Sequence, residues 1–170
     1  MKLTSRKLFL FIFVCCGSLL GFAYYAQYAM GMEPCNLCII QRVFFYALGI
    51  IALIAAIHGP AKIGRRIYAV LASLAALGGL LVAWRHVWMQ GLPPDQVPDC
   101  GPGLNWMLEE MPLSEVWNNL FYGSGSCADI DWTFLGLSMP GWVLVWFIFL
   151  LLVSLVILFR KGKNQDRYVY

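Results

Sequence analysis

Charged side chains are scarce in this chain. Of its 170 residues, 12% are Asp, Glu, Lys or Arg and 61% are hydrophobic, whereas a soluble domain has about 25% charged and about 45–50% apolar residues. A soluble fold with this balance would leave large apolar patches in water, which promotes aggregation. A disordered chain would contain far less to bury, and the sequence has no repeats or low-complexity tracts. The remaining class is an integral membrane protein.

Long apolar runs take the place of the missing charges. A helix crosses a bilayer with about 20 apolar residues, and four stretches qualify: Leu8–Met32, Cys35–Ile57, Ile67–Trp84 and Trp132–Phe159. The first exceeds a signal-peptide core and lacks a convincing cleavage site, so we expect it to be retained. The fourth is expected to be helical only after Met139-Pro140-Gly141, because proline suits a helix start. We predict an all-α membrane protein, a four-helix bundle with spans at about 8–30, 37–57, 67–88 and 141–159.

The charges that are present alternate along the chain. Ten of the twelve Lys and Arg residues occupy three segments: Lys2, Arg6, Lys7; Lys62, Arg65, Arg66; and Arg160, Lys161, Lys163, Arg167. Eight of the nine acidic residues lie between those segments: Glu33, Asp95, Asp99, Glu109, Glu110, Glu115, Asp129 and Asp131. Basic loops face the cytoplasm, so both termini are expected there, with outer loops at about 31–36 and 89–140. The net charge of +3 therefore reflects topology in the lipid bilayer, and no nucleic-acid partner is expected.

Four of the six cysteines fall in or beside the outer loops, where disulfides form and persist. Four cysteines allow three pairings. The Cys-x-x-Cys spacing favours a local pair, Cys35–Cys38, which leaves Cys100 and Cys127 to join across the second loop. Cys15 and Cys16 lie within the first span and are expected to be packing residues, because adjacent helical positions do not face each other.

The second outer loop is too long for a structureless connection, so it should be functional or partly folded. Its sequence predicts a short helix that begins at Ser114 as N-cap and ends at Gly123. The apolar face of this helix could lie on the membrane surface.

Cys35 and Cys38 stand where the second span begins. A helix N-terminus favours the thiolate form of a cysteine, and positions 35, 38 and 42 share one helix face. An arginine in a span costs about 2.5–3.5 kcal/mol at mid-span, so Arg42 is either a snorkelling interfacial residue or a fixed cation facing a thiolate and an electron acceptor. Arg85 and His86 end the third span at the same level, flanked by Trp84 and Trp88. This combination favours a site for a polar headgroup with a lipid-soluble tail.

Simpler interpretations of the cysteines also exist. Cys35 and Cys38 could form a structural disulfide, whereas a zinc site is disfavoured because there is no second Cys-x-x-Cys; no metal is expected. A disulfide between Cys100 and Cys127 could be a structural crosslink of the loop, which would stabilise the folded state by about 3.5 kcal/mol. Glycines flank both cysteines, however, and an exposed disulfide in a mobile loop is labile.

The sequence Cys35-Asn-Leu-Cys38-Ile-Ile-Gln-Arg42 resembles the DsbB family of bacterial inner-membrane disulfide-bond formation proteins. The later Cys100 and Cys127 and the block Trp132-Thr-Phe-Leu-Gly-Leu-Ser-Met-Pro-Gly-Trp142 extend the resemblance to nearly the whole chain. It implies a multi-pass protein of the bacterial inner membrane whose catalytic loops are periplasmic. It also implies a protein-disulfide oxidoreductase that oxidises a periplasmic DsbA-like thiol oxidase and reduces a quinone, ubiquinone or menaquinone, from the membrane quinone pool.

The resemblance also implies roles for single residues. The Cys100–Cys127 pair would oxidise DsbA, with Cys100 forming the mixed disulfide, and electrons would then pass to the Cys35–Cys38 pair. Cys38 would be the thiolate that faces the quinone. Arg42 matches the quinone-site arginine of the family and His86 its histidine near the ring, whereas Arg85 departs from the acidic residue of some relatives.

Two other classes of protein fit part of the pattern. A vitamin K epoxide reductase-like enzyme is also a helical bundle with a Cys-x-x-Cys and a quinone, but it usually carries the motif on a late span. A non-enzymatic scaffold would use its disulfides only to staple the outer loops. The redox state of the cysteines distinguishes the scaffold, because staples stay oxidised with or without quinone.

Overall fold

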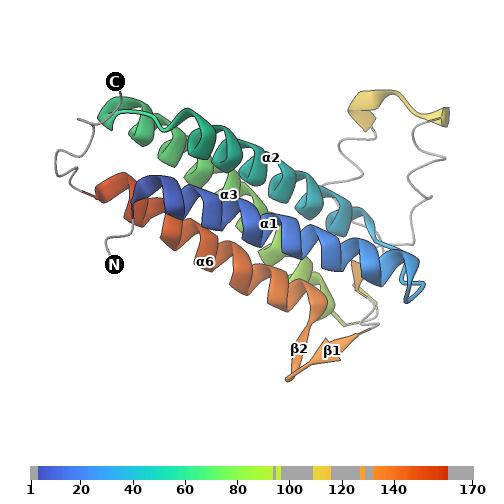
Figure 1. Ribbon diagram of the computed structural model, residues 1–170. Coiled ribbons are helices and arrows are strands. Elements are labelled where there is room, and N and C mark those ends of the chain that lie inside the picture. Colours follow the sequence, from blue (N-terminus) through green and yellow to red (C-terminus); the bar gives the residue numbers. More distant parts are fainter. Residues whose placement is uncertain (1–3, 94, 97–108, 116–126, 129–131, 161–170) are drawn as a thin grey trace.

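The computed structural model describes residues 4–93, 95–96, 109–115, 127–128 and 132–160. Its long elements are four helices arranged as a bundle (Figure 1): α1 (Ser5–Tyr28), α2 (Asn36–His58), α3 (Lys62–Gln90) and α6 (Met139–Phe159). All four are long and apolar enough to cross a membrane. The predicted four-helix membrane bundle is thereby confirmed.

Local sequence explains where two of these helices start or stop. Gly59 ends α2 in the left-handed conformation, with φ of 54°, and Pro60 follows, which is a common helix termination. Ser138 is the N-cap of α6 and its Oγ accepts a hydrogen bond from the Gly141 N–H at 3.4 Å. Because of this cap, α6 begins at Met139 and contains Pro140 in its first turn, two residues earlier than the span predicted from 141.

A small hairpin precedes α6 and was not predicted from the sequence. Strands β1 (Thr133–Phe134) and β2 (Leu137–Ser138) pair antiparallel, with Thr133 opposite Ser138. The two turn residues, Leu135 and Gly136, have φ of 51° and 81°, as a tight two-residue hairpin turn requires. The hairpin fixes the direction from which the chain enters α6.

Small residues let the helices approach closely. α3 packs along both α2 and α6, and α1 packs along α2. A Cβ atom added at Gly79 would lie 2.2 Å from the Phe147 ring, and one added at Gly78 would lie 2.4 Å from the Phe44 ring. Phe147 also stacks on Phe45, with ring centroids 4.2 Å apart. Close backbone approach at small residues is typical of membrane helices.

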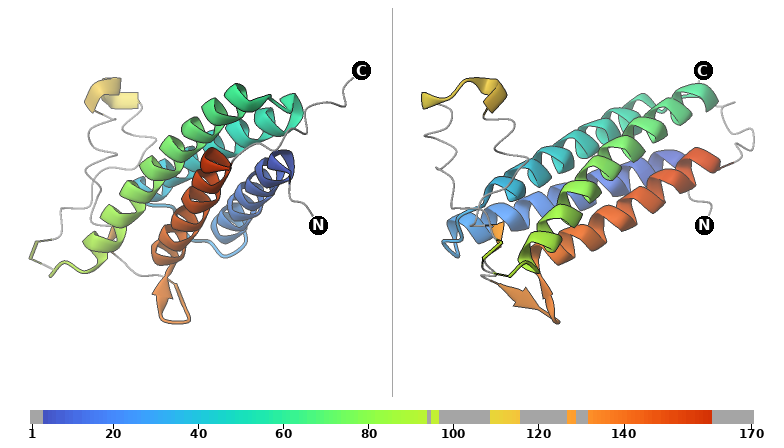
Figure 2. Two further views of the ribbon diagram at one scale, coloured as in Figure 1. Left: turned by 90° about the vertical axis from the view of Figure 1, so that its left-hand side faces the viewer. Right: turned by 180° about the vertical axis from the view of Figure 1, so that it is seen from behind.

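The helices alternate in direction, so the bundle has two distinct ends (Figure 2). At one end Arg6 Nε donates to the Ala56 carbonyl at 2.6 Å, and an Arg65 N–H donates to the Arg160 carbonyl at 2.9 Å. These arginines satisfy carbonyls near helix C-termini, which lack intrahelical partners. The opposite end carries the α1–α2 connection, the end of α3 and the hairpin (Figures 1 and 2), and the predicted site residues gather there.

The helix predicted in the second outer loop falls mostly outside the described residues. Residues 113–115 are helical. Ser114, the predicted N-cap, therefore lies inside this helical turn, one residue after its start. The segment 116–126, which carries the predicted apolar face, is not described. Its contact with the membrane surface stays a prediction.

Candidate active site at the start of α2

Cys35 and Cys38 lie together at the first turn of α2. Cys35 is the N-cap residue of the helix, and its Sγ lies 3.2 Å from the Sγ of Cys38. A disulfide needs about 2.05 Å between sulfurs, so a small movement would join or separate the two. Unpaired N–H groups at a helix N-terminus stabilise a thiolate there, which suits this pair to redox exchange.

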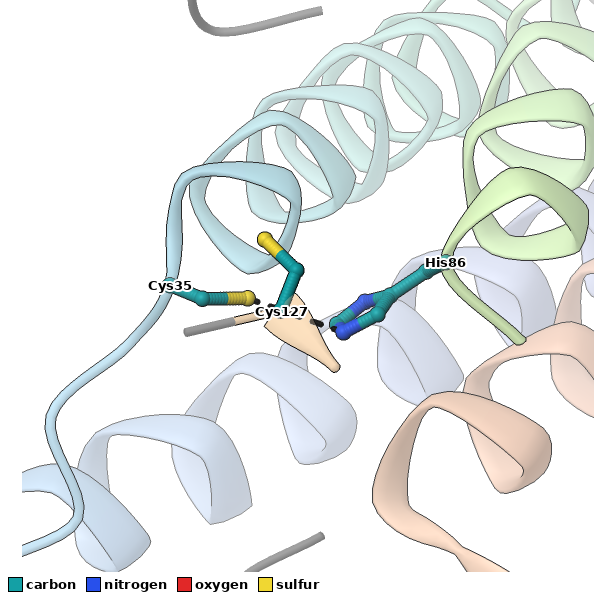
Figure 3. A group of neighbouring side chains, drawn as sticks. All are labelled: Cys35, His86 and Cys127. Carbon is teal, nitrogen blue, oxygen red and sulfur yellow. Dashed lines mark hydrogen bonds between the residues drawn. The ribbon is translucent and has the colours of Figure 1, made fainter. Parts of the chain in front are cut away.

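His86 reaches the dithiol from the neighbouring helix α3. Its Nε2 lies 3.6 Å from Cys35 Sγ, and its Nδ1 lies 3.1 Å from the Gln41 side-chain amide. Both His86 and Gln41 are buried. Because one ring nitrogen is held by the amide, the other is aimed at the sulfur (Figure 3).

Cys127 lies at the same place, although it belongs to the segment between α3 and α6. It is fully buried, and its Sγ lies within 4.8 Å of both Cys35 Sγ and a ring nitrogen of His86. Figure 3 shows the three side chains beside one another, with Cys35 entering from α2 and His86 from α3. The structure therefore places one cysteine of each expected redox pair next to the other, Cys35 beside Cys127.

Arg42 is oriented by groups of α1. Its Nη1 donates to Gln27 Oε1 at 2.5 Å, its Nη2 donates to the Ala23 carbonyl at 3.2 Å, and its guanidinium carbon lies 5.0 Å from the Tyr24 ring centroid. A guanidinium has five N–H donors, so these bonds leave others for a ligand. Such fixed contacts agree with the interpretation of Arg42 as a positioned cation.

One pocket connects these groups. Its volume is about 350 Å³, and its walls include both sulfur residues Cys35 and Cys38 together with Arg42, Gln41 and His86. Apolar and aromatic side chains make up most of the remainder. They come from α1 (Leu19, Leu20, Phe22), α2 (Phe45), the hairpin and the residue before it (Phe134, Trp132) and α6 (Trp142, Val143, Trp146). An apolar pocket with a few converging polar groups is the usual form of a small-molecule site.

Other expected site residues are placed differently. Arg85 is half-buried and does not line this pocket. Trp84 and Trp88 are exposed, so the aromatic wall near His86 comes from the hairpin and α6 instead. The reason is helical geometry, because residues adjacent to His86 on α3 point away from the face that His86 occupies. Cys100 lies outside the described residues.

Two functional residues were missed in the sequence. Gln27 and Gln41 are amides in otherwise apolar spans, and each holds a predicted site residue, Arg42 and His86 respectively. Polar side chains within a span are costly and are often functional, so this signal was available. Cys15 and Cys16 contribute to the core, where Cys16 is buried against α2 near Gly49.

Comparison with known proteins bears on this geometry. The family profile of "Disulfide bond formation protein DsbB" matches residues 5–157. The chain belongs to the DsbB family. It is 44% identical over 164 residues to disulfide bond formation protein B of Marinobacter nauticus, covering 96% of this chain and 98% of the relative. It is 53% identical over 142 residues to the protein of that name from Acinetobacter baumannii, covering 83% of each chain.

Membership in the DsbB family establishes the general activity. The chain is a membrane-embedded, disulfide-forming oxidoreductase. The pocket at the start of α2 is lined by two neighbouring thiols, Cys35 and Cys38.

Proposed function

We propose that this DsbB-family protein oxidises a periplasmic DsbA-type dithiol protein and passes the electrons to a membrane quinone in the bacterial inner membrane. The observation that supports this proposal best is the pocket of about 350 Å³, in which Cys35 and Cys38 share apolar walls with Arg42 and His86. A quinone has an apolar ring and tail and two polar oxygens, and this pocket combines apolar walls with the polar side chains of Arg42 and His86.

The residues at the pocket divide the work of quinone binding. Arg42 would supply N–H donors to a quinone oxygen, and Gln27 and Ala23 hold the guanidinium in place. His86 stands beside the dithiol, where it can hold or release a proton at Nε2. The bound quinone supplies the oxidising capacity, since it takes up an electron pair and two protons. The pocket walls keep water away, which strengthens the electrostatic contribution of Arg42.

Electrons reach the pocket by disulfide exchange. A partner thiolate attacks Cys100, which forms a mixed disulfide and releases the Cys127 thiolate. Cys127 then attacks Cys35, breaks the Cys35–Cys38 bond and leaves Cys38 as a thiolate. The proximity of Cys127 Sγ to Cys35 Sγ, within 4.8 Å, supports this order. The second partner thiol completes the partner disulfide, and Cys100 then restores its bond to Cys127, leaving Cys35 and Cys38 reduced.

A quinone-reduction assay tests this function. The purified full-length chain is mixed with a reduced DsbA-type protein and either ubiquinone or menaquinone, and quinone absorbance is followed over time. We expect reduction that depends on both the partner and Cys38, with a Cys16→Ala variant as the matched control that retains activity. If every cysteine stays oxidised whatever the quinone supply, the disulfides are staples and the proposal is wrong.

A further inference from the structure

Cys35, His86 and Cys127 form a cluster of potential metal ligands that comes from three different segments of the chain. One ligand atom from each lies within 4.8 Å of the other two, and His86 and Cys127 are buried. In a tetrahedral zinc site, bonds of about 2.3 Å to sulfur and about 2.0–2.1 Å to nitrogen place the ligand atoms about 3.5–3.8 Å apart. The 3.6 Å from Cys35 Sγ to His86 Nε2 already meets that spacing.

We propose that these three residues bind a thiophilic cation, Zn²⁺ or Cd²⁺, when the protein is fully reduced. Binding forms two metal–sulfur bonds and one metal–nitrogen bond, and the two thiols release their protons. Two thiolates neutralise a divalent cation, so the occupied site carries no net charge in its apolar surroundings. A disulfide at either Cys35 or Cys127 removes a ligand, and the site therefore exists in only one redox state of the protein.

The surroundings of the cluster suit a metal. A metal-bound histidine donates its other ring N–H to an oxygen, which fixes the ring. Gln41 is in that position, since its amide lies 3.1 Å from His86 Nδ1, and a half-turn of the amide presents Oε1 to the ring N–H. The pocket that Cys35 and His86 line gives an ion access. It also leaves room for a fourth, non-protein ligand.

The cluster depends on tertiary structure, whereas a simple Cys-x-x-Cys chelate would not. Cys38 Sγ is 3.2 Å from Cys35 Sγ, yet Cys38 is not a member of the group whose atoms are all within 4.8 Å. The proposal thus assigns the metal to Cys35, His86 and Cys127 and leaves Cys38 out. A metal ion bound at this site would also block disulfide exchange between Cys127 and Cys35. That consequence rests on the proposed function, whereas metal binding itself does not.

The experiment measures metal binding directly. The full-length protein in detergent is reduced with a phosphine, and the reductant is then removed under anaerobic conditions. The reduced protein is titrated with Co²⁺, whose thiolate charge-transfer absorption reports ligation by sulfur. Zn²⁺ is then added as a competitor. We expect one metal ion per reduced chain and none per oxidised chain. Cys127→Ser and His86→Ala should each weaken binding by at least about 100-fold, as loss of a ligand exceeds the 10–100-fold cost of losing an outer partner.

Two matched controls make the result specific. Cys38→Ser should bind as tightly as the unaltered protein, and Gln41→Leu should weaken binding by about tenfold. In the unaltered protein, bound Zn²⁺ should protect Cys35 and Cys127 from alkylation, measured by mass spectrometry, while Cys38 still reacts; this readout needs no variant to fold. Binding that requires Cys38 but tolerates loss of Cys127 and His86 would overturn the proposal, as would a reduced chain that binds no metal. Neither result depends on quinone or on a protein partner.

Discussion

Arg42 illustrates how single residues determine the chemistry of this protein. Its charge is half-buried in a membrane-spanning helix, and two of its N–H groups are bonded to α1 at Gln27 and Ala23. An arginine so constrained has little freedom to follow solvent, and Arg42 keeps further N–H donors at the wall of the pocket. Gln41 acts similarly on His86. Arg42 and His86 are thus each held by a glutamine of the same pocket, Gln27 and Gln41 respectively.

Replacement of Arg42 by alanine should weaken quinone binding far more than it lowers protein abundance. A charge-assisted hydrogen bond is worth about 1.5–3 kcal/mol, which corresponds to about a ten- to hundred-fold rise in KM for quinone. Arg42→Lys should restore only part of the affinity, because the planar fork is lost. The exposed Arg66→Ala serves as the charge-matched control and should leave the KM unchanged. An unaltered quinone dependence in Arg42→Ala would contradict the proposed role.

Cys15→Ser and Cys16→Ala should leave disulfide transfer intact, singly and together. On α1, Cys16 is buried in the core and Cys15 packs against it, and neither lines the pocket that holds Cys35 and Cys38. Transfer to a reduced partner is measured at matched protein levels. Lost activity in Cys16→Ala at normal abundance would mean that a redox residue has been misplaced.

At the scale of elements, the contact of α3 with α6 sets the position of the site. His86 is carried by α3, and α6 contributes Trp142 and Trp146 to the pocket. These helices approach closely because Gly79 has no side chain where the Phe147 ring lies. A shift of α3 would move His86 relative to Cys35, so packing and chemistry are linked.

Gly79→Ala should therefore destabilise the bundle. The added methyl would lie 2.2 Å from Phe147, and overpacking of this kind costs about 1–3 kcal/mol. Gly17→Ala in α1 is the matched control, since nothing lies within 4 Å of its new methyl and alanine favours a helix. Thermal unfolding in detergent should show a lower Tm for Gly79→Ala and an equal or higher Tm for Gly17→Ala. Equal Tm values in both variants would show that α6 accommodates the methyl.

The whole molecule is organised around one end of the bundle. The end of α1, the start of α2, the end of α3 and the start of α6 all contribute to the pocket. Cys127, from the segment between α3 and α6, lies beside Cys35 and His86 of that pocket. At the opposite end, Arg6 and Arg65 link neighbouring helices through hydrogen bonds to the Ala56 and Arg160 carbonyls. The proposed transfer of electrons from an outside partner needs such an arrangement, because it places Cys127 next to Cys35.

The first contact with the partner should occur at Cys100. Asp99, Gly101, Pro102 and Gly103 surround it in the sequence and offer little bulk, whereas Cys127 is buried beside Cys35. A DsbA-type partner that lacks its second active-site cysteine should form a mixed disulfide that cannot resolve. Mass spectrometry of the trapped complex should locate the partner on Cys100. A partner found mainly on Cys127 or Cys35 would reverse the proposed order of electron flow and leave quinone reduction standing.

The sequence by itself determined the class and the general architecture. Its apolar runs predicted four membrane helices because each helix satisfies its own backbone in lipid, and that bundle is observed. The Cys-x-x-Cys at a helix start and Arg42 one turn further are local features, since helical periodicity alone places them on one face. Each could be read without knowing how the helices pack.

Only the tertiary structure decided which residues meet. The family resemblance assigned His86 to the site, but helical periodicity alone does not determine how α3 is rotated about its axis. The packed structure shows that His86, and not Trp84, Arg85 or Trp88, lines the pocket beside the dithiol. The distance from Cys127 to Cys35 depends on a loop whose length alone does not fix its path. The roles of Gln27 and Gln41 depend on pairs separated by 15 and 45 residues. Contacts between distant segments are set by the packing of whole helices, and local sequence carries no direct record of them.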